Sequence, residues 1–359
     1  MARRRSRALI WLALALVAGC AVGYGGLVHL WGELPRAGSG REIAIDVPRG
    51  TGPHALSRLL ASHGVVDSAW LFELYVRVRR ASPRIRAGRY LLGDDLSPSQ
   101  VLGRIARVGA GGALRVTIPE GMNLFRIAEL LQREGVVAAP AFLEAARDPL
   151  LLAELRVSGE SAEGYLFPDT YDLLPGSRAE SVVRRLKSNF DRRVAPVFAT
   201  EAARVAALGQ IARLDERGVV VIASLVEAET RLPAERPRVA AVFLNRLSAA
   251  GFVPRYLSSD PAVAYGCQVA PSLAPSCARA TGRPGDITRA MLDDRKNLYN
   301  TYRHAGPPPG PVCNPGLEAI RAVLHPAETE DLYFVARGDG SHAFARTLPE
   351  HNQNVRRYR

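Results

Sequence analysis

The sequence is poor in residues that bind metals or form redox pairs. It has four cysteines among 359 residues (Cys20, Cys267, Cys277 and Cys313), and no two of them form a C-x-x-C pair. This argues against a zinc ribbon or a thioredoxin-type site. The seven histidines are scattered without H-E-x-x-H spacing, so we expect no bound metal. G-x-S-x-G, Walker A and G-x-G-x-x-G motifs are also absent. The usual motifs of serine hydrolases, nucleotide-dependent enzymes and dinucleotide-binding enzymes are therefore missing, and we expect no cofactor.

Negative charge is also scarce, with 35 Asp and Glu against 47 Lys and Arg, a net charge of +12. Such an excess suits nucleic acid, an anionic membrane surface or an acidic polymer as a partner. Hydrophobic residues make up 47% and charged residues 23%, as in ordinary globular proteins, so most of the chain should fold. The length predicts two or three domains.

The N-terminal segment predicts a membrane anchor. Residues 1–7 hold four arginines, and residues 8–30 contain no Asp, Glu, Lys or Arg. About 20 apolar residues suffice to cross a bilayer. We therefore expect a cytoplasmic tail over 1–7 and a transmembrane helix over 8–31, with the remaining chain exported by the positive-inside rule. Export argues against nucleic acid as a partner and permits disulfides.

Two other interpretations share this orientation. A cleaved signal peptide usually has an apolar region of about 7 to 15 residues, which is shorter than this one. The string VAGC ending at Cys20 resembles a lipoprotein processing site, which would make Cys20 an acylated N-terminus. The apolar run continues ten residues past Cys20, and this favours the intact anchor.

After a linker (32–41), the sequence contains an internal repeat with an offset of 71 residues. The matching pairs are Pro48/Pro119, Gly50/Gly121, Gly64/Gly135, Val65/Val136 and Val66/Val137. Each copy predicts a strand, a Pro-x-Gly turn, two helices, a second strand and a final helix. The two copies, 42–110 and 113–190, are therefore expected to be related α+β modules.

The C-terminal half has a different pattern and is expected to be a catalytic or binding domain. Residues 219–230 form an apolar run that ends in two acids, and residues 236–250 have helical periodicity. Beyond Gly251 we expect mostly loop, with a Pro/Gly cluster over 306–316. A helix over 317–324 and two strands, over 331–336 and 342–346, complete the chain.

Glu227 and Glu229 are candidate acids. A carboxyl among apolar neighbours has a raised pKa, which lets it hold a proton near neutral pH. The alternative is that both acids begin a solvated helix end. Asn245 and Arg246 on the next helix could cap it or form a salt bridge.

The stretch 299–316 concentrates polar and aromatic side chains on a proline-rich segment: Tyr299, Asn300, Tyr302, Arg303, His304 and Asn314. Phenol rings can stack on sugars, and side-chain amides can pair with hydroxyl and acetamido groups. Functional sites often lie on loops held by a rigid scaffold. The alternative is a proline-stiffened surface loop.

Several ordered blocks carry a resemblance. In chain order they are IPEGMNLFRIAELL, EGYLFPDTYDL, ASLVEAET, PRVAAVFLNRL, LSSDPAVAYG, YNTYRHAGPPPGPVCNPG and LYFVARGDGSHAFARTLPEHN. Together these blocks resemble the MltG/YceG-like family of endolytic murein transglycosylases. The resemblance implies an α+β protein with an N-terminal transmembrane helix, a LysM-like wall-binding module (42–110) and a YceG-like catalytic domain (111–359, including the second repeat).

The resemblance also implies an activity. A single-pass enzyme of the inner membrane, with its catalytic domain outside the cytoplasm, would cleave the MurNAc–GlcNAc bond of nascent peptidoglycan and leave 1,6-anhydro ends. Glu227 would be the catalytic acid, with Glu229 as the alternative. The expected substrate-binding residues are Glu229, Asn245, Asp260, Asn300, Tyr302 and Asn314. The expected partners are glycan strands, the membrane and peptidoglycan synthases, with no nucleic acid. The alternative function is a non-catalytic wall-binding scaffold for synthases.

The sequence departs from the family pattern in several places, and two of these leave the expected Asn and Tyr unchanged: SPYNTY reads NLYNTY, and GLPPGP reads GPPPGP. LQSD in the family reads LSSD here, so Ser258 replaces a glutamine. The segment between Tyr265 and Tyr299 is longer than the family needs. We expect a disulfide to hold this insertion, joining Cys267 to Cys277 or including Cys313 as one partner.

Overall fold

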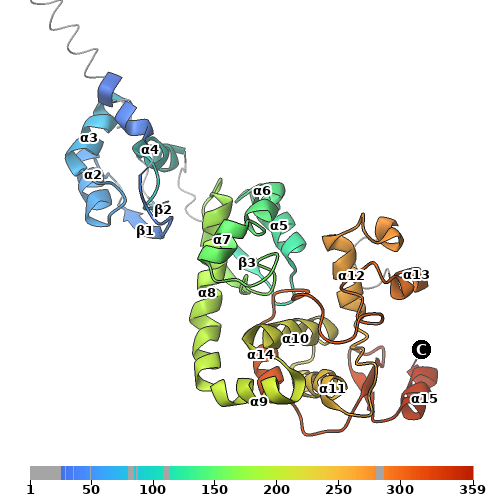
Figure 1. Ribbon diagram of the computed structural model, residues 1–359. Helices are drawn as coiled ribbons and strands as arrows, with labels where there is room; N and C mark the ends of the chain where they lie inside the picture. Colours follow the sequence, from blue (N-terminus) through green and yellow to red (C-terminus); the bar gives the residue numbers. More distant parts are fainter. Residues whose placement is uncertain are drawn as a thin grey trace, which may run out of the picture. The chain divides into compact units, whose positions relative to one another are not determined.

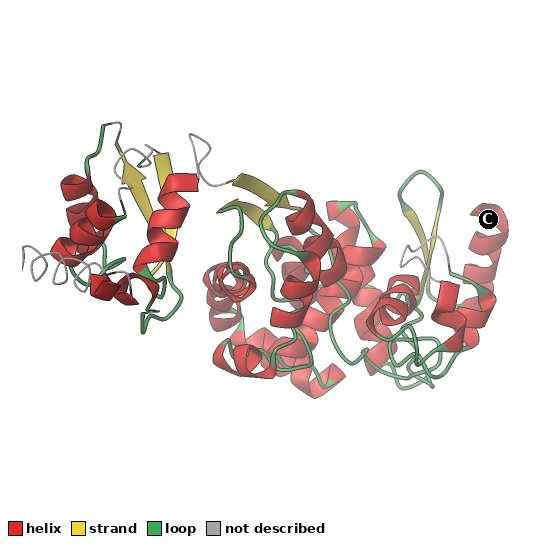
Figure 2. Cartoon of the chain, turned by 90° about the horizontal axis from the view of Figure 1, so that it is seen from above, coloured by secondary structure: helices red, strands yellow, loops and turns green. Residues whose placement is uncertain are grey.

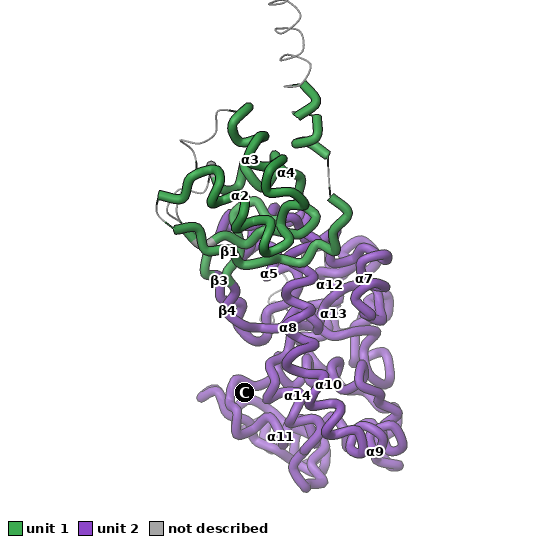
Figure 3. Tube along the Cα trace, turned by 90° about the vertical axis from the view of Figure 1, so that its left-hand side faces the viewer, with its two compact units in different colours: residues 1–115, 172–177 green, residues 116–171, 178–359 purple. Residues whose placement is uncertain are grey.

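The computed structural model describes residues 26–28, 30–34, 36–48, 50–79, 85, 88–107, 114–279 and 287–358. The expected cytoplasmic tail, Cys20 and most of the expected membrane span lie outside the described residues. Among the described residues, no helix combines the length and the apolar composition needed to cross a bilayer. The chain divides into two compact units, residues 1–115 with 172–177 and residues 116–171 with 178–359 (Figure 3).

The first unit contains an antiparallel strand pair, β1 (Glu42–Val47) and β2 (Gly88–Gly93), in which Ile45 lies opposite Tyr90. Alternate residues of β1 point inward because strand side chains alternate between faces, so Ile45 and Val47 are buried. Beyond β1 this unit contains the helices α2 (Pro53–Ser62), α3 (Ala69–Val78) and α4 (Pro98–Arg107). Their apolar faces supply the rest of the core, including Leu56, Leu60, Phe72, Tyr75 and Ile105.

The second copy of the repeat follows the same order of elements. It consists of β3 (Leu114–Ile118), α5 (Leu124–Arg133), α6 (Ala139–Ala145), α7 (Pro149–Glu154), β4 (Asp169–Leu173) and α8 (Ala179–Thr200). β3 and β4 form a second two-stranded sheet. The strand–helix–helix–strand–helix order predicted from the repeat is confirmed in both copies, with α7 as an addition in the second.

The centre of the second unit is the buried helix α10 (Glu216–Glu229), which begins after α9 (Ala202–Ala212). Asp215 caps α10 by accepting a hydrogen bond from the backbone N–H of Gly218 at 2.8 Å. Residues 219–226 are buried on every side of the helix, as expected for a helix without a polar face. Helices α11 (Arg236–Ser248) and α14 (Leu317–Leu324) pack against it (Figure 1).

The chain beyond Gly251 is more regular than expected. It forms α12 (Asp260–Val269), the 3₁₀ helix η3 (Pro275–Arg279), α13 (Arg289–Asp293) and a terminal helix α15 (Leu348–Tyr358). The loop-rich character expected between Gly251 and α14 is confirmed, but the sequence did not predict these short helices or α15. α12 is buried along most of its length and so lacks a clear polar face. The predicted hairpin is present as β5 (Tyr333–Ala336) paired with β6 (His342–Ala345) (Figure 2).

Candidate active site

Glu227 lies in the last turn of α10 with its side chain only 5% exposed. Its Oε1 accepts a hydrogen bond from Nη2 of Arg236 at 2.7 Å, and its Oε2 accepts one from the backbone N–H of Gly316 at 3.0 Å. Gly316 is the N-cap residue of α14. The carboxyl group therefore faces both a guanidinium and the positive end of a helix.

The Pro-x-Gly turn of the second repeat closes around this carboxyl group. A Cβ atom on Gly121 would lie 3.6 Å from Cγ of Glu227. Oε2 of Glu120 lies 3.2 Å from the same Arg236 nitrogen that contacts Glu227. A Cβ atom on Gly316 would lie 1.9 Å from Oε1 of Glu120. Glycine at 316 thus allows the loop and the turn to approach Glu227 together.

These neighbours act on the pKa of Glu227 in both directions. Burial raises it, and the N–H of Gly316 and the guanidinium of Arg236 oppose this by favouring the anion, while the charge of Glu120 raises it further. The net result is a raised pKa. A carboxyl group of this kind can carry a proton, and two donors are already in place to hold the anion after the proton leaves.

Arg236 has one donor to spare. The residue is 7% exposed, and its Nη2 is shared between two carboxylates. Its Nε is buried without a hydrogen-bond partner in the described part of the chain. Buried donors are nearly always paired in proteins, so this unpaired N–H is an unusual feature of the side chain that contacts Glu227.

Glu229 lies two residues further along α10 and faces a different set of residues. Its Oε1 accepts a hydrogen bond from Oγ of Ser259 at 2.6 Å. Burial raises the pKa of Glu229 to about 7; the Ser259 hydrogen bond acts against this and the charge of Asp260 adds to it. Asp260 in turn accepts a hydrogen bond from the hydroxyl of Tyr302 at 2.8 Å. The structure thus brings together three of the predicted residues, Glu229, Asp260 and Tyr302.

Asn300 is fully buried and is used inside the protein. Its Nδ2 donates to the carbonyl oxygens of Met291, Leu292 and Asp294, at 2.8 to 3.1 Å. Its Oδ1 accepts from the backbone N–H of Tyr302. The expectation that this amide contacts sugar is therefore revised: Asn300 positions Tyr302.

Asn314 is likewise fully buried. Its Nδ2 donates to the carbonyl of Met122 at 3.0 Å and to Glu163 at 2.7 Å, and its Oδ1 accepts from the N–H of Leu166 at 2.8 Å. It therefore attaches the proline-rich loop to the second repeat, two residues before Gly316. Its role too is revised from sugar contact to loop support.

Asn245 is on α11 and lies apart from both acids. Its Nδ2 donates to the carbonyl oxygens of Thr329 and Asp331 at 2.8 and 3.0 Å. This holds the segment that leads into β5. Asn245 is partly buried, and both of these hydrogen bonds are internal to the protein.

Glu163 is a buried acid that the sequence reasoning missed. It is 1% exposed, and its Oε2 accepts from the N–H of Leu124 at 2.7 Å while its Oε1 accepts from Asn314. Burial raises its pKa to about 8. A comparison of the repeat copies would have indicated it, because Ala87 stands before Gly88 in the first copy and Glu163 before Gly164 in the second.

The same comparison indicates Glu120, since the first copy has Pro-Arg-Gly (48–50) where the second has Pro-Glu-Gly (119–121). The two copies therefore share the same order of strands, turns and helices, but only the second carries acidic residues at these turns. Arg236 stands one residue before the block PRVAAVFLNRL, and nothing in its local pattern marks it as a partner of Glu227.

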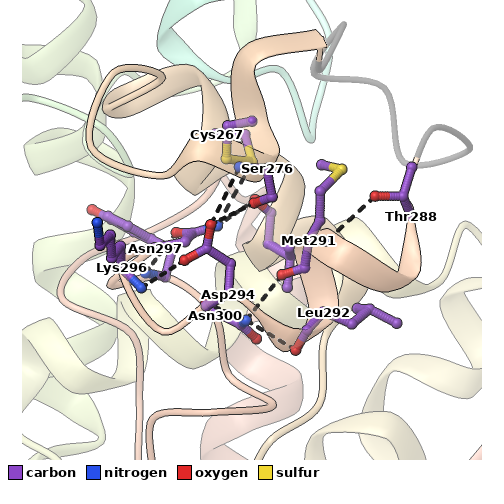
Figure 4. Close-up of a disulfide and its surroundings, with 12 residues drawn as sticks. Cys267, Ser276, Thr288, Met291, Leu292, Asp294, Lys296, Asn297 and Asn300 are labelled. Atoms are coloured by element: carbon purple, nitrogen blue, oxygen red, sulfur yellow. Dashed lines mark hydrogen bonds between the residues drawn. A yellow bond between two sulfur atoms is a disulfide. The ribbon is translucent and has the colours of Figure 1, made fainter.

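The inserted segment is closed by a disulfide between Cys267 of α12 and Cys277 of η3, ten residues apart (Figure 4). Asp294 accepts a hydrogen bond from Oγ of Ser276 at 2.7 Å beside it. Cys313 is a free, buried thiol that donates to the carbonyl of Ser224 at 3.2 Å. Within the described ranges, His, Cys, Asp and Glu form no group of three or more that could hold a metal ion.

The fold and the site together define a chain with a tandem α+β repeat and a helical unit in which the buried carboxyl group of Glu227 is held by a guanidinium and a backbone N–H. A model of the YceG-like family matches residues 45–357, and the chain belongs to that family.

Curated relatives support this assignment. The chain is 27% identical over 333 residues to the endolytic murein transglycosylase of Bacillus subtilis, covering 88% of this chain and 84% of the relative. It is 28% identical over 380 residues to the protein of that name from Streptococcus pneumoniae, covering 97% of this chain but only 63% of the relative's length. A solved putative YceG-like protein of Listeria monocytogenes is 25% identical, with a TM-score of 0.55 over 88% of this chain and 99% of that one.

Proposed function

We propose that this chain is an endolytic murein transglycosylase that cleaves the bond between MurNAc and GlcNAc within glycan strands and leaves 1,6-anhydro-MurNAc ends. The observation that carries the proposal is the environment of Glu227. Its carboxyl group is buried with a raised pKa, yet Arg236 and the N–H of Gly316 stand ready to hold the anion. The names of the relatives supply the substrate class.

In this mechanism Glu227 begins as the acid. It donates its proton to the glycosidic oxygen as the bond to C1 of MurNAc breaks, and the GlcNAc hydroxyl leaves. The resulting carboxylate then takes the proton of the C6 hydroxyl of the same MurNAc while O6 bonds to C1. The proton returns to Glu227, no water is consumed, and the products are an anhydro end and a new GlcNAc end.

One carboxyl group suffices because the substrate supplies the nucleophile. Glycoside hydrolases ordinarily need two, one as acid and one as base or nucleophile. Glu229 is the alternative acid, but the group that donates a hydrogen bond to its carboxylate is the neutral hydroxyl of Ser259. Glu227 is favoured because a guanidinium and a helix N-terminus stabilise the charge that develops on it.

The donors and acceptors proposed for substrate are those with free capacity near the acids. The buried Nε of Arg236 can donate to a sugar oxygen beside Glu227. Asp260 and Tyr302 are partly exposed and can meet a neighbouring sugar. Asn300, Asn314 and Asn245 act indirectly, by holding the segments that carry the contact residues.

The proposal extends to location. Residues 8–31 would anchor the chain once in the inner membrane, with residues 1–7 in the cytoplasm and both units outside it. The first unit would act as a LysM-like wall-binding module. A membrane-anchored cutter of nascent strands would work beside peptidoglycan synthases and could terminate strand elongation.

The test is mass spectrometry of the muropeptides that the purified full-length chain releases from glycan strands. We expect anhydro ends from the wild type and from Glu229→Gln, with a rate reduced at least about 10³-fold in Glu227→Gln. Reducing ends would show a hydrolase instead. If wild type and Glu227→Gln are equally inactive while strands still bind, the scaffold alternative replaces the enzyme.

A further inference from the structure

Glu120 places a second carboxyl group beside Glu227, and the proposed reaction leaves it unused. It stands in the turn after β3, where its side chain is 46% exposed, against 5% for Glu227. Both carboxyl groups contact Nη2 of Arg236, at 3.2 and 2.7 Å, so the contacting oxygens are at most about 6 Å apart, a spacing at which one sugar ring can meet both. This is shorter than the separation of about 6.5 to 9.5 Å in inverting glycosidases, and it admits the separation of about 5 to 5.5 Å in retaining ones.

The position of this carboxyl group is fixed by the packing of its turn on the proline-rich loop. The N–H of Gly121 donates to the carbonyl of Asn314 at 3.0 Å, and the N–H of Asn314 donates to the carbonyl of Met122 at 2.9 Å. A Cβ atom on Gly316 would lie 1.9 Å from Oε1 of Glu120, so the carboxyl group occupies the space that a side chain at 316 would need. The charge of Glu120 is therefore held in place before a substrate arrives, as electrostatic catalysis requires.

Glu120 also has an acceptor that the protein does not use. Among the described residues only Arg236 donates a hydrogen bond to it, at Oε2, and Oε1 accepts none. While Glu227 holds its proton, the charges of Glu120 and Arg236 cancel. When Glu227 gives the proton up, the three side chains together carry one net negative charge. These groups therefore become negative as the bond to C1 of MurNAc breaks.

The proposed reaction needs a negative charge at that moment. Glycosidic cleavage passes through an oxocarbenium-like transition state, which places positive charge on C1. The C6 hydroxyl closes on C1 from the β face of the ring, the face from which the β-linked GlcNAc oxygen departs. That oxygen blocks the hydroxyl until the bond has broken, so C1 has to carry its charge until the ring closes. A carboxylate on the opposite face can stabilise this charge without obstructing either oxygen.

We propose that Glu120 is a second catalytic residue, whose carboxylate contacts the MurNAc ring and stabilises the positive charge at C1 while Glu227 acts as acid and base. This inference rests on the proposed function. Glu120 neither gives nor takes a proton, so the proton still returns to Glu227. Arg49, at the matching turn of the first repeat copy, could not serve in this way, because a cation would oppose the charge at C1.

Glu120→Gln tests the charge alone, because the amide oxygen can still accept from Arg236. The full-length chain, purified in detergent, is assayed on glycan strands by mass spectrometry of anhydro ends, and kcat is read on the pH plateau where Glu227 is protonated. We expect Glu120→Gln to lower this plateau kcat about 10²-fold with KM within about twofold of wild type, because the lost interaction is made in the transition state. Glu120→Asp keeps the charge and should recover part of the loss.

Glu318→Gln is the matched control. Glu318 is an exposed acid in the first turn of α14, two residues after Gly316, and pairs with Arg321 at 2.8 Å. This variant should behave as wild type. If Glu120→Gln moves only the alkaline limb and keeps the plateau kcat, or if Glu318→Gln loses as much, the inference about Glu120 is wrong and the proposed function stands. If wild type and Glu227→Gln release anhydro ends at equal rates, the proposed function itself fails.

Discussion

Glu227 and Arg236 face each other across the turn between α10 and α11, with Nη2 of the arginine 2.7 Å from Oε1 of the glutamate. The same nitrogen lies 3.2 Å from Glu120. The positive charge of Arg236 thus faces two carboxylates, and of these two only Glu227 is deeply buried. This arrangement keeps the pKa of Glu227 raised and still provides a partner for its anion.

The first prediction concerns the alkaline limb of the kcat profile, where the acid loses its proton. Glu120→Gln removes a charge that raises the pKa of Glu227, so this limb should move to lower pH. Arg236→Gln removes a charge that lowers it, so the limb should move to higher pH. Arg236→Gln should also reduce kcat about 10²-fold or more, because the developing anion loses a donor.

The measurement is kcat on glycan strands between about pH 5 and pH 9, the range that brackets a raised carboxyl pKa. Opposite shifts from the two variants are the expected result. Shifts in the same direction would show that the guanidinium does not set the pKa of Glu227.

The second prediction concerns stability against pH. Burial gives Glu163 a pKa of about 8 in the folded chain against an ordinary value of 4.5. The folded state therefore holds this proton more tightly than the unfolded state. The stabilisation is fully present below about pH 4.5 and is lost as pH rises towards about 8, with a slope of at most about 1.4 kcal/mol per pH unit.

Glu163→Gln checks this sign. Chemical denaturation of the variant should show a lower free energy of unfolding at acid pH, because an amide cannot accept from both Leu124 and Asn314. Its stability should also depend less on pH than that of the wild type. An unchanged pH slope in the variant would assign the effect to other groups, among them Glu229, whose pKa is about 7.

The third prediction concerns the disulfide. Closing a ten-residue separation contributes about 2 to 3 kcal/mol in the chain-entropy description. Replacing Cys267 and Cys277 together by serine should make the segment around α12 and α13 more sensitive to proteolysis. Cys313→Ser serves as the control, since that thiol is free. Non-reducing peptide mapping that found Cys267 and Cys277 as thiols would contradict the pairing.

The fourth prediction separates contact from support. Tyr302→Phe removes a partly exposed hydroxyl that donates to Asp260, so KM should rise several-fold while the melting temperature is nearly unchanged. Asn300→Ala removes the three contacts donated by Nδ2 and the one that Oδ1 accepts from Tyr302, and it should lower stability by about 2 kcal/mol or more. Thermal melts and steady-state kinetics on the same preparations distinguish the two, and a pure KM effect of Asn300→Ala would restore it as a sugar contact.

Much of the frame could be predicted from the sequence. The 71-residue repeat predicted the elements of both copies, because matched prolines and glycines mark the same turns. The apolar run over 219–230 indicated burial, but periodicity alone could not distinguish a buried strand from a buried helix, and the structure shows α10.

The surroundings of the acid could not be predicted in the same way. Arg236 bridges to Glu120 across 116 residues of sequence, and the Gly316 donor is a backbone N–H, which every residue but proline possesses. The amides of Asn300 and Asn314 were assigned to sugar because the composition of a loop does not tell inward from outward side chains. The direction of each side chain is decided by packing: Asn314 bonds to the second repeat, and Asn300 bonds to the carbonyl groups in and just after α13.

The two copies of the repeat carry different residues at two corresponding turns. At the Pro-x-Gly turn the first copy has Arg49 and the second has Glu120, beside Arg236 and Glu227. Before the glycine of the second strand entry, the first copy has Ala87 and the second has the buried Glu163. In the second copy Glu120 contacts Arg236 and Glu163 accepts from Asn314, so a change at either position would disturb residues that lie outside the repeat.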